Sequence, residues 1–207
     1  MLDRHLLPLQ RRLLQPPAQA LVSAGISADI VTLVGFILGL LAIPCLAAGA
    51  YLPALALIVL NRIADGLDGA VARLSSPSDR GAFLDIALDF FFYATIPLGF
   101  AFADPENNAL AAAILITTFV GTGSSFLAFA TVAAKRGKTT ESYTAKGIYY
   151  LGGLTEGAET IIVFTLMCLF PAAFPVLATV FAVACMLTTL TRWYQGWISF
   201  GETKERK

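Results

Sequence analysis

The sequence predicts an all-α integral membrane protein with six transmembrane helices, and three observations lead to this fold class. First, 57% of the 207 residues are hydrophobic and only 14% are charged, with a mean hydropathy of +0.74. Soluble domains carry about a quarter charged residues, so this composition does not suit a water-facing surface. Second, the apolar residues gather into stretches of about 20, the length that a helix needs to cross a bilayer. Third, the basic residues lie in alternate loops between these stretches.

Six stretches meet the length requirement. They cover residues 30–49, 52–74, 82–103, 108–134, 147–170 and 175–198. No internal repeat or soluble appendage is evident. We therefore expect residues 1–207 to form a single membrane domain, in which residues 1–24 are a juxtamembrane segment before the first span.

The basic residues of the loops predict the orientation. Lys and Arg occur before the first span, between the second and third, between the fourth and fifth, and after the sixth. The loops at residues 49–51, 104–108 and 171–175 contain neither. By the positive-inside rule, we expect both termini in the cytoplasm, and we expect a multi-pass protein of the inner (cytoplasmic) membrane. The formal net charge of zero provides no field that would attract nucleic acid, so we expect no nucleic-acid partner.

The juxtamembrane segment has an amphipathic pattern. Its first 14 residues contain recurring leucines with three arginines between them. This pattern predicts an interfacial helix on the inner membrane surface that ends at Pro16-Pro17. An ordinary basic flank that anchors the first span is the alternative.

Four aspartates stand inside predicted spans, where a charge is costly. An Asp near the centre of an isolated transmembrane helix costs roughly 2.5 to 3.5 kcal/mol. Asp65 and Asp68 are three residues apart in the second span, and Asp85 and Asp89 are four apart in the third. Each pair therefore lies on one face of its helix. The short loop between the two spans predicts an antiparallel hairpin, in which all four carboxylates converge on one cavity.

Converging carboxylates repel one another unless they share a cation. Oxygen-only ligands suit hard divalent ions such as Mg²⁺ or Mn²⁺ rather than zinc or copper. Water and substrate phosphates would fill the remaining positions, as in two-metal phosphoryl chemistry. Gly66 and Gly69 leave no bulk beside the carboxylates, and Arg73, one turn further on, is placed to reach a phosphate. Helix packing for the glycines and snorkelling for Arg73 are the alternatives.

The aspartates, glycines and arginine belong to one motif. It reads Asp65-Gly-Leu-Asp68-Gly69-Ala-Val-Ala72-Arg73, followed by Gly81, Asp85 and Asp89. This motif, at residues 65–89, resembles the signature of the CDP-alcohol phosphotransferases, D-x-x-D-G-x-x-A-R, a spacer, and G-x-x-x-D-x-x-x-D. Every fixed residue is present. The spacer between Arg73 and Gly81 has seven residues, where we expect eight in most members.

The resemblance implies a membrane enzyme of phospholipid biosynthesis. Such enzymes transfer a substituted phosphate, usually the phosphatidyl group of CDP-diacylglycerol, to an alcohol and release CMP. They use Mg²⁺ or Mn²⁺, and their subunits are six-helix membrane proteins that form dimers. We therefore expect two divalent ions, a CDP-lipid donor, a small alcohol acceptor and a homodimer in the bilayer, with the active site facing the cytoplasm.

The resemblance also implies roles for the motif residues, carried over by position. Asp65, Asp68 and Asp85 are expected to bind metal. Asp89 is expected to complete the metal site and, as the catalytic base, to take the proton of the acceptor hydroxyl. The residues expected against the CDP moiety are Gly69, Ala72, Arg73 and Gly81.

Charged residues outside the motif bear on the acceptor. The cations near the predicted cytoplasmic edge are Arg80, Arg136, Lys138, Lys146 and Arg192. They favour a phosphorylated polyol such as glycerol 3-phosphate, and so an activity like that of a phosphatidylglycerophosphate synthase. Glu156 and Glu159 of the fifth span would instead repel a phosphate. These two either line the acceptor pocket or pair with Arg62 and Arg192 as structural ion pairs.

Two other classes of membrane protein also carry acidic residues in their spans. An ion-coupled transporter would show discontinuous helices in repeated halves, and the sequence shows no such repeat. A Mg²⁺-dependent prenyltransferase would carry Asp-rich motifs far apart in the sequence, whereas here the four aspartates fall within residues 65–89. Release of CMP from a CDP-lipid distinguishes the transferase from both.

Overall fold

The computed structural model describes residues 3–136 and 155–201, and it contains helices but no strand within these ranges. The helices are α1 (Asp3–Ser23), α2 (Ala28–Ala47), α3 (Tyr51–Leu74), α4 (Asp79–Ala103), α5 (Pro105–Lys135), α7 (Gly157–Leu169) and α8 (Phe174–Gly201), with the short 3-10 helix η2 (Pro171–Ala173) before α8. The predicted all-α fold class is therefore confirmed for the described part of the chain.

Four of the described helices are long and apolar enough to cross a membrane. They are α2, α4, α5 and α8, the last together with η2. α3 has 24 residues but carries the charged side chains of Arg62, Asp65 and Asp68, and it is not among the four. α7 has 13 residues and lies within the predicted fifth span. Residues 147–154 of that span lie outside the described residues. The count of six spans stays a prediction.

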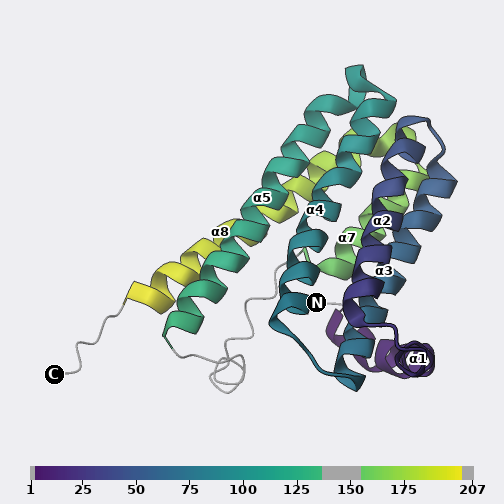
Figure 1. The fold of residues 1–207 in the computed structure, drawn as a ribbon. Helices are drawn as coiled ribbons and strands as arrows, with labels where there is room; N and C mark the ends of the chain where they lie inside the picture. Colours follow the sequence, from purple (N-terminus) through teal and green to yellow (C-terminus); the bar gives the residue numbers. More distant parts are fainter. Residues whose placement is uncertain (1–2, 137–154, 202–207) are drawn as a thin grey trace.

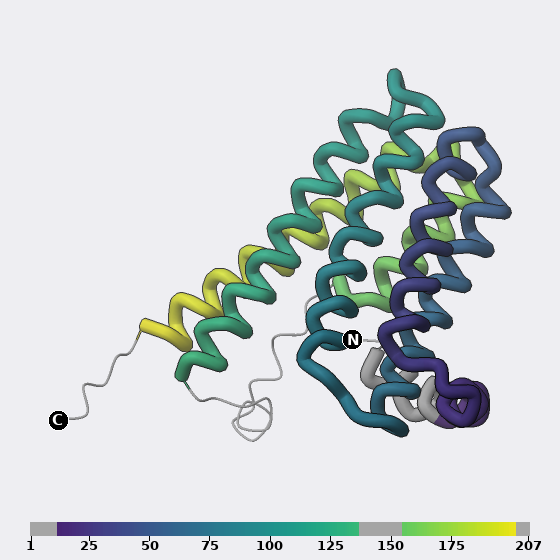
Figure 2. The backbone as a smooth tube through the Cα atoms, viewed as in Figure 1, coloured from purple at the N-terminus to yellow at the C-terminus, as the bar shows by residue number. Residues whose placement is uncertain are grey.

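The helices form a bundle with two sides (Figures 1 and 2). On one side, α2 packs against both α3 and α4. On the other side, α5 packs against α4 and runs beside α8, and this pair leans away from α2 and α3 (Figure 1). α7 contacts both α3 and α8, so it joins the two sides.

The links between helices separate onto two ends of the bundle (Figure 1). At one end α3 connects to α4, and α5 and α8 end there too. The Arg136 guanidinium at the end of α5 donates to the Phe200 carbonyl of α8 at 2.8 Å. At the opposite end lie the links from α2 to α3, from α4 to α5 and from α7 to α8. These three links contain no Lys or Arg.

α1 lies across the end of the bundle where α3 connects to α4 (Figure 1). It runs through Pro16 and Pro17 to Ser23, so the predicted helix end at the two prolines is wrong. Ala18 is buried against Ala70 and Val71 of α3. This tertiary packing offsets the backbone hydrogen bonds that the prolines cannot donate.

The apolar core occupies the half of the bundle away from α1. It is formed by the C-terminal halves of α2 and α4, the N-terminal halves of α3, α5 and α8, and α7. Phe92, Phe100, Phe164 and Phe174 are fully buried there, and the rings of Phe100 and Phe174 stack at 4.5 Å. The half of α3 and α4 nearer to α1 is left for polar side chains.

Two glycines bring α2 close to its neighbours. A Cβ atom on Gly35 would lie 2.6 Å from the Ala64 Cβ, and one on Gly39 would lie 2.7 Å from the Phe92 ring. Real Cβ atoms do not approach so closely, so any side chain at these positions would force the helices apart. The glycines therefore fix the spacing of α2 against α3 and α4, and with it the geometry of the polar half.

Large apolar side chains also point outward. Ile37, Val180 and Trp197 are 56%, 65% and 83% exposed. Helices that are apolar on their outer as well as their inner faces suit a lipid environment rather than water.

Candidate active site

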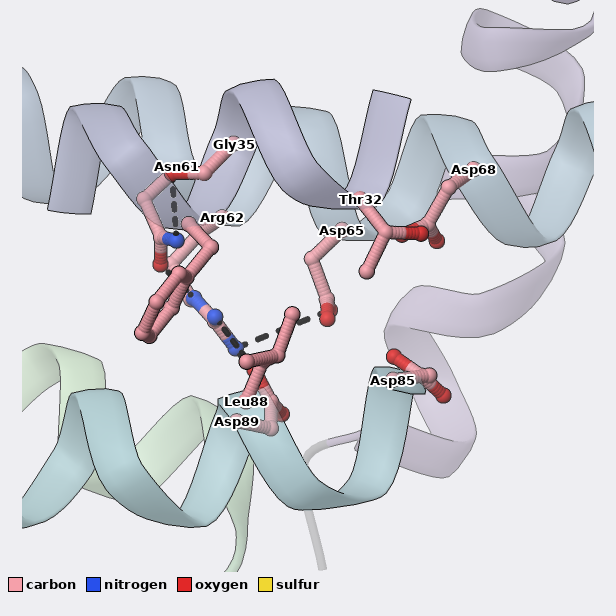
Figure 3. Close-up of a pocket in the computed structure, with 10 residues that line it drawn as sticks. Thr32, Gly35, Asn61, Arg62, Asp65, Asp68, Asp85, Leu88 and Asp89 are labelled. Carbon is pink, nitrogen blue, oxygen red and sulfur yellow. Dashed lines mark hydrogen bonds and ion pairs between the residues drawn. The ribbon is translucent and has the colours of Figure 1, made fainter. Parts of the chain in front are cut away.

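The four aspartates of α3 and α4 line one pocket, here called the carboxylate pocket (Figure 3). Its wall is completed by Thr32, Gly35, Phe36, Asn61, Arg62 and Leu88. The structure thus brings together the four side chains whose spacing predicts that they converge. The cavity volume is about 10 Å³, near the least that one water molecule requires.

Asp68 is the most enclosed of the four carboxylates. The residue is 5% exposed, and the Thr32 hydroxyl donates to its Oδ2 at 2.5 Å. Thr32 lies on α2, 36 residues before Asp68 in the chain. No local spacing connects the two residues, so sequence reasoning had no signal by which to find Thr32.

Arg62 reaches across the pocket from α3 to α4 (Figure 3). Its Nη2 and Nη1 donate to Asp89 Oδ1 at 2.5 Å and to Asp89 Oδ2 at 3.2 Å. Asp65 Oδ2 lies 3.6 Å from Nη1. The sequence raised Arg62 as a partner for the glutamates of the fifth span, whereas these contacts join it to the motif. Its position three residues before Asp65, on the same helix face, was the available signal.

The donor chemistry of the pocket fits a hard divalent cation, but the side chains are not gathered around one point. All four candidate ligands are carboxylates on one cavity, the oxygen set that Mg²⁺ and Mn²⁺ prefer. Among residues 3–136 and 155–201, no three acidic, His or Cys side chains are close enough to hold a metal ion as a group. One of the four, Asp89, is bound by Arg62 in this arrangement.

The residues expected against a CDP moiety lie where α3 ends and α4 begins. Arg73 is exposed, and a Cβ on Gly69 would come within 3.3 Å of its Nη1. Ala72, which lies between Gly69 and Arg73 in the sequence, is partly buried. A Cβ on Gly81 would lie 3.2 Å from both Asp29 Oδ1 and Ser78 Oγ. A side chain at Gly69 or Gly81 would therefore crowd polar side chains at this end of the hairpin, although none of these positions lines the carboxylate pocket.

A larger cavity of about 450 Å³ lies on the other side of α4, and we call it the aromatic cavity. It is lined by Phe90, Tyr93, Phe119, Thr122, Phe126, Thr155, Glu156, Gly157, Thr160 and Arg192. Four helices contribute to it. Two of the residues predicted to line an acceptor pocket, Glu156 and Arg192, therefore share one cavity. The Nη1 of Arg192 donates to the Thr122 carbonyl at 3.0 Å.

Glu156 and Glu159 also have a structural role that sequence reasoning missed. Glu156 is the N-cap of α7, and the pair forms a capping box, in which the Glu156 backbone N–H donates to Glu159 Oε2 at 3.3 Å. The two residues thus stand at the start of a helix rather than in the middle of one. A capping pair satisfies backbone donors that a helix start leaves open, which gives both acidic side chains a structural function.

The other predicted acceptor cations lie apart from the aromatic cavity or outside the described residues. Arg80 is exposed and pairs with Asp29 of α2, its Nε donating to Oδ2 at 2.8 Å. Arg136 caps α5 and donates to the backbone of Ser199 and Phe200. Lys138 and Lys146 lie outside the described residues. Arg192 is the cation that the described structure places on the cavity wall.

Comparison with known proteins gives a family and a fold. The family model described as CDP-alcohol phosphatidyltransferase matches residues 26–199. The chain is 54% identical over 199 residues to the inner membrane protein YnjF of Escherichia coli strain K12, which covers 96% of this chain and 97% of that protein. It is 36% identical over 121 residues to the phosphatidylinositol phosphate synthase of Cutibacterium acnes, over 56% of this chain and 58% of that protein.

Two solved structures share the fold. Both are of the Mycobacterium tuberculosis phosphatidylinositol phosphate synthase PgsA1, at 23% identity and a TM-score of 0.67. The one with CDP-DAG bound covers 90% of this chain and 94% of its own. The one in complex with manganese and citrate covers 89% and 88%.

Proposed function

We propose that this chain, which belongs to the CDP-alcohol phosphatidyltransferase family and is a transferase of phospholipid biosynthesis, moves a phosphatidyl-type group from CDP-diacylglycerol to an alcohol. The observation that carries this proposal is the single pocket shared by Asp65, Asp68, Asp85 and Asp89. The related enzyme with CDP-DAG bound supports the donor.

The reaction exchanges the phosphoanhydride bond of the donor for a phosphate ester bond to the acceptor. The acceptor oxygen forms a bond to the phosphorus next to diacylglycerol, and the bond from that phosphorus to the CMP oxygen breaks. Asp89 accepts the proton of the acceptor hydroxyl, since a positioned carboxylate is the available base beside the pocket. Arg73 and the space beside Gly69, Ala72 and Gly81 hold the CDP part of the donor.

The family uses divalent metals, and a related structure contains manganese. We place two such ions, Mg²⁺ or Mn²⁺, on Asp65, Asp68, Asp85 and Asp89. When bound, they neutralise the pyrophosphate and take up the charge of the departing CMP. The Thr32 hydroxyl holds Asp68 in place for this role.

The proposed topology has six spans within one membrane domain, over residues 1–207. α3 and the segment that includes α7 join the four apolar helices, and α1 is the interfacial helix. The three links without Lys or Arg lie at the end of the bundle opposite the α3–α4 link. By the positive-inside rule, this supports cytoplasmic termini and an active site that faces the cytoplasm. The relative in Escherichia coli is an inner membrane protein, which supports the same membrane here. We also propose a homodimer.

The acceptor enters through the aromatic cavity. Tyr93 lines this cavity and its hydroxyl accepts from Arg62 Nη1 at 3.0 Å, so the cavity adjoins the guanidinium that holds Asp89. Arg192 supplies a cation for a phosphorylated polyol such as glycerol 3-phosphate, the acceptor class that we favour. Glu156 on the same wall favours a neutral or amine-bearing alcohol instead.

The test supplies purified protein with CDP-diacylglycerol, Mg²⁺ or Mn²⁺ and a panel of alcohols. We expect CMP release together with a lipid product whose mass corresponds to a phosphatidyl group on a phosphorylated polyol. A product on an amine-bearing or unphosphorylated alcohol would change the acceptor class. Absence of CMP release with every alcohol would contradict the proposed function.

A further inference from the structure

We propose that Arg62 is a positioning residue that holds the Asp89 carboxylate at the boundary of the two cavities and competes with a divalent cation for it. The role in turnover rests on the proposed function, whereas the competition for Asp89 does not. Arg62 stands outside the D-x-x-D-G-x-x-A-R motif, three residues before its first aspartate.

The contacts of Arg62 use its whole guanidinium. Both terminal nitrogens donate to Asp89, and Nη1 also donates to the Tyr93 hydroxyl at 3.0 Å. The third nitrogen, Nε, donates to Asn61 Oδ1 at 2.8 Å. A planar fork of this kind fixes the direction of a carboxylate, which a lysine ammonium does not.

The guanidinium is itself held rigidly. Its central carbon lies 4.7 Å from the Phe92 ring centre and 5.0 Å from that of Tyr93, and the side chain is only 15% exposed. The buried Asn61 that accepts from Arg62 donates in turn to the Gly35 carbonyl of α2 at 2.9 Å. α2, α3 and α4 therefore all contribute to the orientation of one arginine.

The position of this arginine lies between the two cavities. Asp89 lines the carboxylate pocket, and Tyr93, one helical turn later, lines the aromatic cavity. Arg62 contacts both residues, so it keeps the Asp89 oxygens on the side from which the acceptor would arrive. A base misplaced by about 1 Å costs on the order of a hundredfold in rate.

The charge of Arg62 opposes a cation at the same place. Two of the four carboxylates of the pocket, Asp65 and Asp89, lie within 4 Å of the guanidinium. At a separation of about 5 Å and an effective dielectric constant of about 20, a divalent ion and a unit positive charge repel strongly enough to change affinity more than tenfold. A metal ion that takes Asp89 as a ligand must therefore either displace Arg62 or share the Asp89 carboxylate with it.

The experiment measures Mn²⁺ binding to the purified full chain by the loss of the free-ion paramagnetic resonance signal. Arg62→Gln removes the charge and the fork, and Arg62→Lys keeps the charge alone. Arg12→Gln is the matched control, because it removes an equal charge from the exposed surface of α1. CMP release from CDP-diacylglycerol, with kcat and KM for the donor, is measured on the same proteins.

We expect Arg62→Gln to bind Mn²⁺ at least about tenfold tighter than wild type, while kcat falls about tenfold to a hundredfold with an unchanged donor KM. Arg62→Lys should keep wild-type Mn²⁺ affinity and an intermediate kcat, and Arg12→Gln should match wild type in both. In an Asp89→Asn background, Arg62→Gln should change Mn²⁺ affinity by a smaller factor.

Weaker or unchanged Mn²⁺ binding by Arg62→Gln would overturn the proposal and make Arg62 a purely structural residue, as would wild-type protein that binds no Mn²⁺. A wild-type kcat in Arg62→Gln would overturn the positioning role. Should the Gln variant not fold, Arg62→Met, which keeps the packing against Phe92 and Tyr93, gives the same test. Wild type that binds Mn²⁺ but releases no CMP would contradict the proposed function and leave the competition to be decided by the binding data.

Discussion

The carboxylate pocket and the aromatic cavity lie on either side of α4 and differ in almost every property. The first has a volume of about 10 Å³ and is lined by four carboxylates. The second has about 450 Å³ and is lined mainly by aromatic and hydroxyl side chains with one Arg and one Glu. A small, strongly charged pocket suits metal ions and phosphates, and a wide cavity with balanced charge suits an organic acceptor. We infer from this difference a division of labour, in which the carboxylate pocket serves donor chemistry and the aromatic cavity binds the acceptor.

The largest expected effect concerns the carboxylate pocket alone. Removal of divalent metal with a chelator should abolish CMP release completely, because four neighbouring carboxylates without cations repel the donor pyrophosphate. Activity should return when Mg²⁺ or Mn²⁺ is added in excess. Full turnover in the presence of chelator would show that the carboxylate pocket works without metal. It would contradict the assignment of metal-dependent donor chemistry to this pocket.

The next effect tests the residue at the boundary of the two cavities. Asp89→Asn keeps the size of the side chain but removes the proposed base, so kcat should fall about 10²- to 10⁴-fold. Binding of CDP-diacylglycerol, measured by its protection against thermal unfolding, should largely survive. A variant with wild-type kcat would place the base on another residue.

A smaller effect should follow from displacing Phe92 and Asn61, the residues that hold Arg62, without changing the charge of either cavity. A Cβ on Gly39 would lie 2.7 Å from the Phe92 ring and 2.9 Å from Asn61 Nδ2, so Gly39→Ala should destabilise the protein by about 1 to 3 kcal/mol. Gly196→Ala in α8 is the control, since its Cβ would meet Phe129 at an ordinary 3.8 Å. Equal thermal unfolding of the two variants would show that the close packing of α2 is not required.

The two regions also differ in how far the sequence predicts them. Asp65, Asp68, Asp85 and Asp89 are paired at helical spacing on two helices joined by a short loop, so local periodicity places them around one pocket. Their roles stay predictions, although the family that the motif resembles is confirmed by the match over residues 26–199. Thr32 could not be predicted, because its contact with Asp68 depends on how α2 packs, and that packing is set by Gly35 and Gly39.

The aromatic cavity was predictable only in part, because its residues come from distant segments. The charges of Glu156 and Arg192 predict that they line an acceptor pocket, and the structure places both on the cavity wall. The charges of Arg80 and Arg136 predict the same, yet Arg80 binds Asp29 and Arg136 binds the end of α8. Charge near a membrane edge does not specify a partner; tertiary packing does.

The division of labour is tested most directly by crossed steady-state kinetics on two variants, with CDP-diacylglycerol and the acceptor identified by mass spectrometry. Asp68→Asn should raise the KM for the donor and the Mn²⁺ concentration needed for half-maximal activity. The acceptor KM should stay at the wild-type value. Arg192→Gln should raise the KM for a phosphorylated acceptor about tenfold or more, the loss of one charge-assisted hydrogen bond, and leave the donor KM unchanged. If each variant instead raised both KM values by the same factor, donor and acceptor would share one site, and the assignment of the two cavities would be wrong.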